Sequence, residues 1–560
     1  MDSHRSHRDQ SFPTTGRTDG APGIRVSGTR SADRPGIAFG LVAAVHVAIG
    51  AWAILAYRHQ INPDGVSYIS IARKYLAGDI DAAINAYWSP LQSWLLAPLL
   101  GVGLPPALAA RVLALALSLV LLRGAWHIAR NLGLARWPAA LICIALVPIT
   151  LNLGMTTITA DLLATTLVVL YLVVMTRPDG VATRRDAIIA GLLGGLAFLA
   201  KSYLLGFFLL HYLAIMLWRL RSGVDASRRQ LALAGTALLT CGVIAAAWTG
   251  ALSLKYGRLT MGSTGAYNHA LHHPVERGHP HHIDGLLRPP NATAVSAWED
   301  PTYTAIHEWS PFESTRNLLH VLRRIHTNTR EAIAVLQWYS LLSIGIIVAA
   351  LLVAGGRLEP GPAMPVLVLL LAAGIQPLGY LVFQITSRYL APAAVSLFLL
   401  GAFLVTHNRW LGTATLRANA VLALLCASFA LEPAQSLWRQ RGTGQADHEL
   451  ALALDNVIPR GSRVASNTQW AQTMRIAFEN GWRYFGELQP GVTAEAALFQ
   501  LDRHAIDYFI VWDSARTWRF TDDWVEVSGN RVPQARIYRV EHDEGMNSLN
   551  SVDREPVPRG

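Results

Sequence analysis

The sequence is poor in charge, in lysine and in cysteine, and each shortage excludes a class of protein. Charged residues make up only 15% of the 560 residues, whereas an ordinary soluble chain has about 25%. Only three of the 47 basic residues are lysines. The three cysteines all stand inside apolar runs, so they supply neither a disulfide framework nor a CxxC metal site.

The net charge of +10 does not predict a nucleic-acid-binding surface. The arginines collect in short connections and in the N-terminal tail, as is typical of a membrane-topology signal. Residues 1–35 are polar and rich in Arg, Ser and Gly, which predicts a disordered cytoplasmic tail. The first apolar run lacks a small-residue cleavage site and is long enough to span a membrane, so we expect no cleaved signal peptide.

The chain does contain repeated apolar runs of about 20 residues, the length that crosses a hydrocarbon core. Hydrophobic residues make up 52% of the chain, and the mean hydropathy is +0.30. The sequence therefore predicts an α-helical polytopic membrane protein. We expect eleven spans, near 37–57, 105–127, 137–155, 158–176, 186–200, 203–219, 231–253, 333–354, 364–385, 389–406 and 412–431.

Arginines follow the second, fourth and sixth predicted spans, and they lie on one side only if the N-terminus is cytoplasmic. A single helix over 186–219 would place two Arg-rich connections on opposite sides, so we expect a break at 201–203. The transmembrane domain then covers 36–431 in the inner membrane. Its outer loops, 58–104 and 254–332, share the extracytoplasmic side with the C-terminal segment 432–560.

The segment 432–560 is too polar to span a membrane. Its apolar residues follow a strand period in some stretches and a helix period in others. Strand-like runs at 462–466, 507–512 and 535–540 alternate with helical patterns such as 493–505, which predicts a small α/β domain. It has no nucleotide-binding glycine pattern. We therefore expect an accessory or acceptor-facing role for this domain.

The stretch INPDGVSYISIARKY, at 61–75, places an acid where the chain has just left the first span. Asn62 as a cap, Pro63 at the first helical position and Gly78 at the end predict a short helix. With Lys74 facing the headgroups, this helix would lie along the membrane surface. Asp64 is then either an acid stabilised by the helix dipole, an effect of about 0.3–1 kcal/mol, or a catalytic group.

The pattern D-G-x-x-Y-x-x-x-A that begins at Asp64, followed by WSPLQSWLLAPL, resembles the GT-C superfamily of integral-membrane glycosyltransferases. The nearest branch contains the protein O-mannosyltransferases and the lipid A aminoarabinose transferase. There, an acid at the start of the first outer-loop helix acts in catalysis, and the sugar comes from a polyprenyl-phosphate carrier. The resemblance implies that role for Asp64 and makes Tyr68 an expected wall of the site. The aminoarabinose transferases usually have Asp-Glu where this chain has Asp64-Gly65, so a paired carboxylate is lost.

Further charged residues stand at the predicted outer ends of spans. Asp161 opens the fourth span and is either functional or an interfacial acid favoured by the helix dipole. Lys201 either neutralises a lipid phosphate or extends to the headgroups. Arg388 and Tyr389 stand in an R-Y-L-x-P phrase that recurs in GT-C enzymes, where it resembles a carrier-phosphate contact; the alternative is an interfacial anchor pair.

The loop 254–332 contains nine of the 19 histidines. Clustered histidines bind divalent metals, so a metal site is a weak alternative to solvated side chains; its candidates are His269, His272 and His273. Later in the loop, aromatic residues stand beside carboxylates, a mixture that suits a sugar's apolar faces and hydroxyl groups. The candidate acceptor- or sugar-binding residues are Trp298, Glu299, Asp300 and Trp309.

The resemblance, together with the predicted shared face of these charged residues, implies an inverting glycosyltransferase that moves a sugar from a polyprenyl-phosphate carrier to an envelope glycan, lipid or protein acceptor at the extracytoplasmic face. Asp64 acts as general base, and Arg388 with Lys201 stabilises the leaving phosphate. No cofactor is required, although a divalent metal is compatible with the chemistry. Two alternatives are a transporter or flippase for a lipid-linked glycan and a non-catalytic scaffold. The sequence identifies neither the sugar nor the acceptor.

Overall fold

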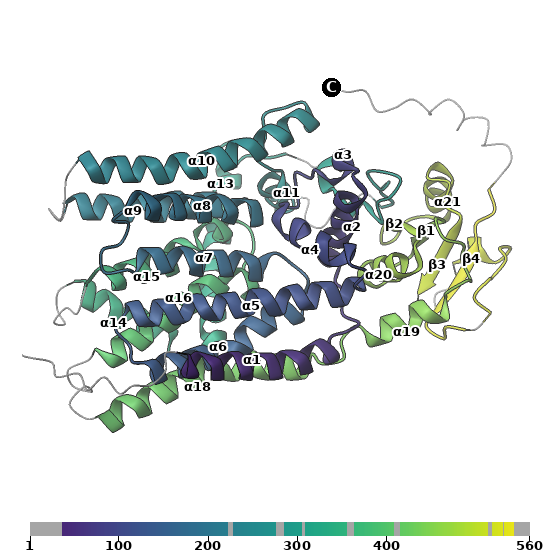
Figure 1. Ribbon diagram of the computed structural model, residues 1–560. Helices are drawn as coiled ribbons and strands as arrows, with labels where there is room; N and C mark the ends of the chain where they lie inside the picture. Colours follow the sequence, from purple (N-terminus) through teal and green to yellow (C-terminus); the bar gives the residue numbers. More distant parts are fainter. Residues whose placement is uncertain are drawn as a thin grey trace, which may run out of the picture. The chain divides into compact units, whose positions relative to one another are not determined.

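The long apolar runs form helices in the computed structural model (Figure 1), which describes residues 36–221, 228–275, 285–304, 308–355, 363–407, 415–512, 518–529 and 531–542. The predicted tail at 1–35 lies outside the described residues. From Ala38 onward the chain forms one unit.

Eight helical segments in the described part of the chain are long and apolar enough to cross a membrane, or nine if one bent pair counts as a span. The protein is an integral membrane protein. The eight are α1 (Ile37–Ala56), α5 (Pro106–Asn131), α6 (Arg136–Met155), α9 (Leu204–Arg221), α10 (Arg228–Tyr256), α16 (Ser387–Thr406), α18 (Thr415–Arg439), and α15 (Ala363–Ile375) continued by η3 (Leu378–Val382).

Each of the eleven predicted spans contains a helix, but not every one of these helices is long enough for a straight crossing. Helix α7 (Asp161–Met175) has 15 residues and α8 (Arg184–Ala200) has 17, fewer than the roughly 20 of a straight crossing. The prediction of one straight span at 333–354 was wrong, because these residues belong to two helices that meet at a sharp bend. Helix α13 (Thr315–Tyr339) meets α14 (Ser343–Ala354) at 102°. The bend follows Ser340, whose backbone is extended and whose hydroxyl group bonds that of Ser428 at 2.7 Å.

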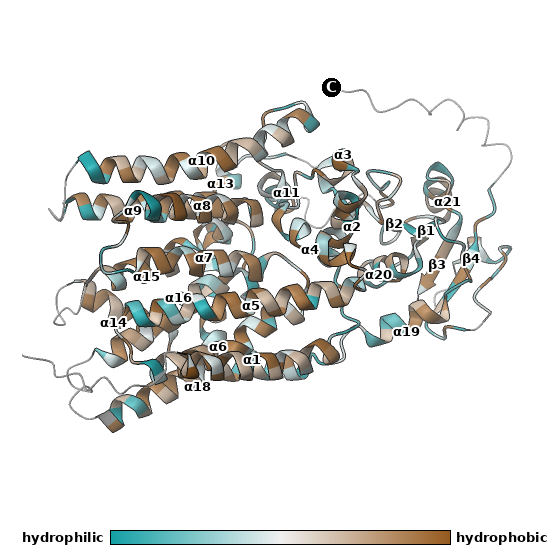
Figure 2. Cartoon of the chain, in the orientation of Figure 1, coloured by the Kyte–Doolittle hydropathy of each residue, from teal (hydrophilic) through white to brown (hydrophobic). Residues whose placement is uncertain are grey.

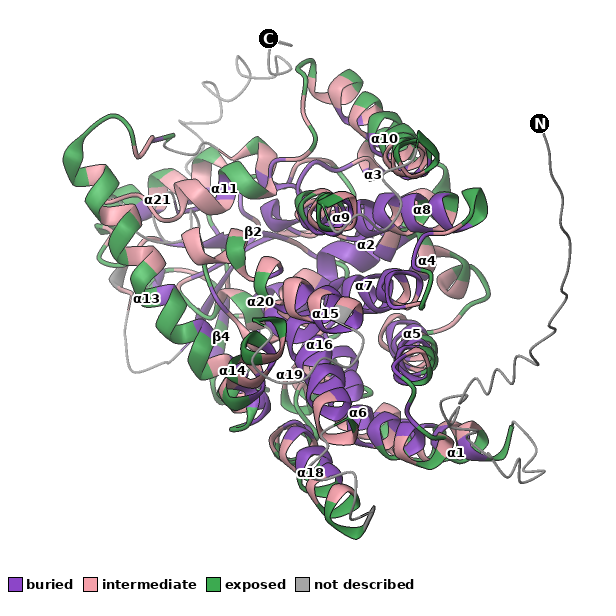
Figure 3. Cartoon of the chain, turned by 90° about the vertical axis from the view of Figure 1, so that its left-hand side faces the viewer, coloured by how far each residue is buried: buried purple, intermediate pink, exposed green. Residues whose placement is uncertain are grey.

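Burial separates central helices from peripheral ones. In their most apolar windows α16 and α6 are 78% and 72% buried, whereas α1 and α10 are 28% buried. Figure 3, which looks along the helices, shows this gradient, and Figure 2 shows apolar residues along the lengths of both groups. Exposed side chains such as Leu55, Leu239 and Val243 suit an acyl-chain environment, since soluble monomers rarely expose large apolar patches.

The break expected between α8 and α9 is confirmed. Helix α8 ends at Ala200, Lys201 has an extended backbone, and α9 begins at Leu204. The break was expected to keep two Arg-bearing connections on one side of the membrane, the one between α7 and α8 and the one between α9 and α10. Hydrogen bonds join these two connections. Arg219 donates to the Asp179 carbonyl oxygen and Arg229 to that of Ala182, both at 2.9 Å.

The segment 58–104, predicted as the first outer loop, forms α2 (Pro63–Ala77), α3 (Ile80–Ala83) and α4 (Leu91–Gly101). Helix α2 begins at Pro63 as predicted, and Gly78 ends it in the left-handed conformation, with φ at 75°. Asn62 does not cap this helix with its side chain. Its Oδ1 instead accepts the backbone N–H of Ile158 at 2.7 Å, which ties the start of α2 to the connection before α7.

Lys74 corrects the expectation that α2 lies open on the membrane surface. It is 4% exposed, and its Nζ lies 2.5 Å from Glu299 Oε1 in η1 (Ala297–Glu299). Helix α2 is therefore enclosed between α4 and η1. The same outer loops contain α11 (Thr264–Ala270) and η2 (Pro301–Tyr303).

A fully buried arginine joins three helices at the end of the bundle near α2. Arg111 of α5 donates to the carbonyl oxygens of Gly154 at 3.0 Å, Tyr57 at 3.4 Å and Gln60. These carbonyls lie in and after the last turns of α6 and α1, where helix dipoles favour a cation. The guanidinium thereby ties the ends of α1 and α6 to α5.

The C-terminal segment forms a four-stranded sheet of order β2-β1-β3-β4. Strand β1 is parallel to both β2 and β3, and β4 is antiparallel to β3. The three predicted strands and the predicted helix are confirmed, whereas α19, α20, β2 and η4 were not predicted. The elements are α19 (Gln445–Ala453), β1 (Arg463–Ser466), α20 (Trp470–Asn480), β2 (Arg483–Glu487), α21 (Ala494–Arg503), β3 (Tyr508–Trp512), η4 (Arg519–Thr521) and β4 (Ala535–Arg539).

This sheet is hydrogen-bonded to the second outer loop. Tyr484 N–H donates to the Val295 carbonyl oxygen, and Leu287 N–H to that of Phe485, both at 2.7 Å. Arg475, which is 2% exposed, bonds Asp447 Oδ2 at 2.9 Å in α19 and the carbonyl oxygen of His59, just after α1. The sheet is thus held against the outer loops.

Candidate active site

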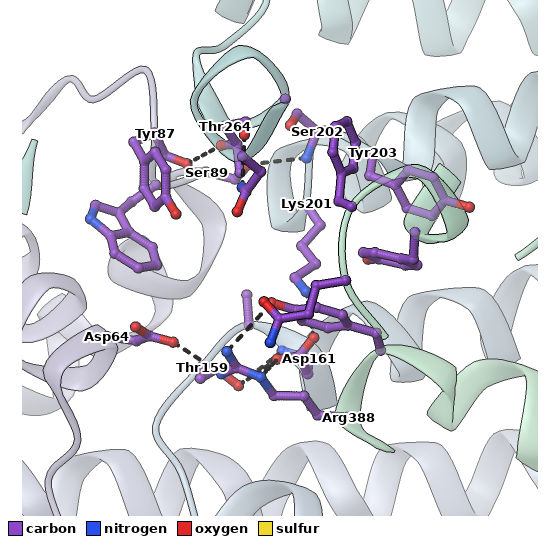
Figure 4. Close-up of a pocket in the computed structure, with 18 of the residues that line it drawn as sticks. Asp64, Tyr87, Ser89, Thr159, Asp161, Lys201, Ser202, Tyr203, Thr264 and Arg388 are labelled. Carbon is purple, nitrogen blue, oxygen red and sulfur yellow. Dashed lines mark hydrogen bonds and ion pairs between the residues drawn. The ribbon is translucent and has the colours of Figure 1, made fainter. Parts of the chain in front are cut away.

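A cavity of about 470 Å³ lies where the outer loops meet the ends of α7 and α16 (Figure 4). Its walls come from α2, the turn at 87–89, the start of α7, the break after α8, α11, η1, η3, the start of α16 and the start of α20. The volume is within the range of about 300–1,000 Å³ for small-molecule sites.

Four charged side chains form an alternating series along one wall. Lys201 Nζ lies 2.5 Å from Asp161 Oδ1, and Asp161 Oδ2 lies 3.7 Å from Arg388 Nε. Arg388 Nη1 then donates to Asp64 Oδ2 at 3.0 Å. Figure 4 shows this order, from Lys201 through Asp161 and Arg388 to Asp64. The four residues predicted to share one face are therefore in direct contact.

Each of the four stands at or near a helix end. Asp161 is the first residue of α7, and Arg388 is the second residue of α16. Lys201 stands in the break after α8, and Asp64 is in the first turn of α2. At such positions a charged side chain can lie outside the apolar interior of the helix bundle and line the cavity. The bond from Asn62 to Ile158 brings the first turn of α2 close to the start of α7.

Aromatic rings surround the cationic end of the cavity. Lys201 Nζ lies 4.3 Å from the ring centre of Tyr389 and 5.7 Å from that of Tyr380, and the two rings stack at 4.6 Å. A cation over an aromatic face is stabilised by about 0.5–2 kcal/mol. The Lys201 ammonium group is therefore stabilised by the Tyr389 ring as well as by Asp161.

The other end of the cavity is built from indole rings. Trp298 Nε1 donates to Asp64 Oδ1 at 3.2 Å, so each oxygen of this carboxylate accepts a hydrogen bond. The Trp298 carbonyl oxygen accepts from Ser67 Oγ at 3.2 Å and Trp88 Nε1 at 3.0 Å. Tyr68 also lines the cavity; burial raises its pKa, so its hydroxyl group stays protonated.

No protein-family model matches the sequence, and no curated protein matches it. Solved structures do match the fold. The oligosaccharyltransferase of Archaeoglobus fulgidus in its apo form has a TM-score of 0.57 and 13% identity over 86% of this chain and 70% of its own. ArnT from Cupriavidus metallidurans in the apo state has a TM-score of 0.52 and 14% identity over 90% of this chain and 98% of its own. The same enzyme bound to undecaprenyl phosphate has a TM-score of 0.53 and 12% identity over 89% and 97%.

This chain has the GT-C fold. In that fold, three of the predicted sugar-binding residues lie away from the cavity. Glu299 is paired with Lys74, and Asp300 accepts from Tyr256 Oη at 2.5 Å and Thr302 N–H at 3.2 Å. Burial raises the pKa of Asp300. These carboxylates hold the second outer loop in place, and only Trp298 of the four candidates lines the cavity.

The predicted histidine site is not assembled in the described residues of this GT-C fold. Within the described ranges, no group of three or more His, Cys, Asp or Glu is placed to hold a metal ion. The His269 ring stacks on Trp309 at 4.2 Å, and Trp309 is not among the described residues that line the cavity. Burial and the nearby Arg324 lower the pKa of His272 to about 4. His273 lies near the same ring, 6.0 Å from Trp309.

Sequence reasoning missed part of the cavity of this GT-C fold. The signal for Tyr87 and Ser89 was present in the aromatic, proline-broken run at 85–100. Thr264 and Asn268 stand in α11, a helix of seven residues with no distinctive pattern. Trp470 begins the unpredicted α20, so nothing local marked it.

Proposed function

We propose that this chain is a glycosyltransferase that moves a sugar from a polyprenyl-phosphate carrier to an acceptor hydroxyl group. The alternating series of Lys201, Asp161, Arg388 and Asp64 on a cavity wall supports this proposal most directly. In this series a carboxylate that suits proton transfer lies beside two cations that suit a phosphate. The GT-C fold and the likeness to a protein solved with undecaprenyl phosphate agree with it.

The cations suit a phosphate that gains charge during the reaction. The donor's phosphodiester carries one negative charge, and cleavage of the bond between the sugar and the phosphate oxygen adds a second. Arg388 binds phosphate oxygens bidentately, and Lys201 acts as a point charge. Asp161, 3% exposed, holds both cations before the donor arrives. Preorganised charges of this kind stabilise a transition state more than water does.

The proposed reaction is an inverting displacement at the anomeric carbon. The acceptor oxygen forms the new bond to this carbon, and the electron pair of the breaking bond stays on the phosphate oxygen. Asp64 takes the proton from the acceptor hydroxyl group as general base. Arg388 and Trp298 hold the carboxylate through one oxygen each, which orients it toward the cavity.

Metal use and membrane orientation are part of the proposal. Lys201 and Arg388 supply the positive charge that a divalent ion would bring, so we expect transfer to survive a chelator. The Arg-rich connections favour a cytoplasmic N-terminus, which places the cavity and residues 432–560 on the extracytoplasmic face of the inner membrane. Thiol labelling of the variant Glu495→Cys in intact cells tests this, because Glu495 is exposed in α21; labelling only after lysis contradicts the orientation.

The test uses purified protein, a panel of radiolabelled undecaprenyl-phosphate sugars and a cell-envelope fraction. The variant Asp64→Asn keeps the side chain's size but is not a base, so transfer should fall by about 100- to 10,000-fold. The matched control is Asp81→Asn, an exposed acid in α3, which should transfer like the wild type. Unchanged transfer in Asp64→Asn contradicts the assignment of the base. Movement of the donor across vesicles without any transfer supports the flippase alternative.

A further inference from the structure

The C-terminal α/β domain reaches into the cavity. Among the described residues that line it, Trp470 is the one contributed from beyond α18. Its ring lies edge-to-face against Trp298, with centres 5.9 Å apart. Trp298 in turn donates to Asp64. The Trp470 indole of this domain therefore contacts the side chain that hydrogen-bonds the proposed base.

The loop that presents Trp470 is rigidly held. Asn467 Nδ2 donates to the Trp512 carbonyl oxygen at 3.0 Å, and Trp512 N–H donates back to Asn467 Oδ1 at 2.8 Å. Trp470 N–H donates to Glu487 Oε2 at 3.1 Å. Between them, Gln469 has φ at 62° and ψ at 44°, a left-handed conformation that is unfavourable for residues other than glycine.

These contacts come from the carboxyl ends of three parallel strands. Strand β1 ends at Ser466, β2 at Glu487 and β3 at Trp512, and the loop 467–469 crosses this edge. In open α/β sheets, ligands bind outside the carboxyl ends of the strands. Backbone strain that the surroundings maintain is also concentrated at functional sites. Both observations indicate that the domain presents Trp470 to a ligand.

The two ends of the cavity differ in chemistry, and this difference indicates which substrate Trp470 contacts. Lys201 and Arg388 form the cationic end, whereas Trp298 and Trp470 form the indole end, with Asp64 between them. In an inverting displacement the acceptor approaches opposite to the leaving phosphate. If the phosphate occupies the cationic end, as the proposed function requires, the acceptor enters from the indole end.

Resting on that proposed function, we propose that Trp470 is an acceptor-binding residue, and that the acceptor is an uncharged carbohydrate whose ring packs on its indole. The apolar faces of a sugar ring suit an indole surface. Two neighbouring lining residues, Tyr87 and Thr264, carry no charge that would select a charged acceptor. The Tyr87 ring centre lies 5.3 Å from that of Trp298, and the Thr264 hydroxyl group donates to the Tyr87 carbonyl oxygen. The C-terminal domain is then part of the substrate site.

The experiment measures two reactions of the same full-length protein with the radiolabelled undecaprenyl-phosphate sugar. One is transfer to a glycan prepared from the envelope fraction, measured over a range of glycan and of donor concentrations. The other is release of free sugar when water is the acceptor, which needs no acceptor site. The variants are Trp470→Ala and Trp470→Phe. The control is Phe499→Ala, an exposed aromatic residue of α21 in the same domain.

We expect Trp470→Ala to raise the glycan concentration for half-maximal transfer about tenfold or more. The half-saturating donor concentration and the release of free sugar should stay within about twofold of wild type, and Trp470→Phe should recover most of the affinity. Equal losses in both reactions, or an unchanged glycan dependence, overturn the proposal. If the wild type transfers the sugar to an envelope protein or lipid but not to the glycan, the acceptor is not a carbohydrate, and that part of the proposal is overturned. Absence of both reactions in the wild type overturns the proposed function itself, and this inference with it.

Discussion

Two lysine–carboxylate pairs in this protein have the same geometry but different surroundings. Lys74 and Glu299 lie 2.5 Å apart, with side chains 5% and 3% exposed. Lys201 and Asp161 also lie 2.5 Å apart, but Lys201 is 22% exposed and lines the cavity. The first pair joins α2 to η1, and the second is open to a ligand. Burial of a charge in an apolar chain therefore does not by itself distinguish an enclosed pair from one that a ligand can reach.

The largest expected effect is on the enclosed pair. Lys74→Met leaves Glu299 buried without its cation, and loss of one partner of a buried pair costs about 3–5 kcal/mol. We expect the free energy of unfolding, measured by denaturant titration in detergent, to fall by this amount. The double variant Lys74→Met/Glu299→Met should recover most of it, because apolar replacement of a buried pair is often neutral. An equally unstable double variant would show that the pair itself stabilises the fold.

The corresponding change in the open pair should affect transfer rather than stability. In Lys201→Met, Asp161 keeps Arg388 at 3.7 Å, so we expect unfolding close to that of the wild type. Transfer from the undecaprenyl-phosphate donor should fall about 100-fold, which is typical for loss of one preorganised donor. A stability loss as large as that of Lys74→Met would remove the distinction between the two pairs.

A smaller effect should follow from exchanging one cation for another within the open series. Arg388 contacts Asp64 through Nη1 and Asp161 through Nε. A lysine provides a single point charge and cannot keep this forked geometry. We expect Arg388→Lys to lower kcat for transfer about tenfold, with little change in unfolding. Wild-type kcat in this variant would show that only the charge matters.

The smallest effect is expected for an ion pair that is neither enclosed nor near the cavity. Arg439 and Glu432, near the end of α18, lie 2.5 Å apart with side chains 60% and 35% exposed. Exposed pairs contribute about 0–1 kcal/mol. Glu432→Ala should therefore change the unfolding free energy by less than about 0.5 kcal/mol and leave transfer unchanged. A larger change would show that exposure does not rank these pairs.

The sequence predicted features that depend on local chemistry. Pro63 and Gly78 act on their own backbone, so the limits of α2 were correct. Asp64, Asp161, Lys201 and Arg388 were recognisable because charges are rare in an apolar chain and each stands at the end of a run.

What failed depended on partners far away in sequence. The partner of Asn62 is Ile158, and that of Lys74 is Glu299; neither spacing follows a helical or strand period. Trp470 was missed because its position in the cavity depends on strands β1, β2 and β3 together. Long-range pairing of this kind leaves no periodic signal in the sequence.

The guanidinium of Arg111 has a consequence for the order in which the protein is assembled. All three of its carbonyl partners, Tyr57, Gln60 and Gly154, belong to the first 155 residues. This junction can close as soon as α6 has left the ribosome and entered the bilayer. This contact among α1, α5 and α6 needs none of the later segments that bear Lys201, Arg388 and Trp470. The cavity wall is complete only when those later segments are in place, because they contribute lining residues from α16 and α20.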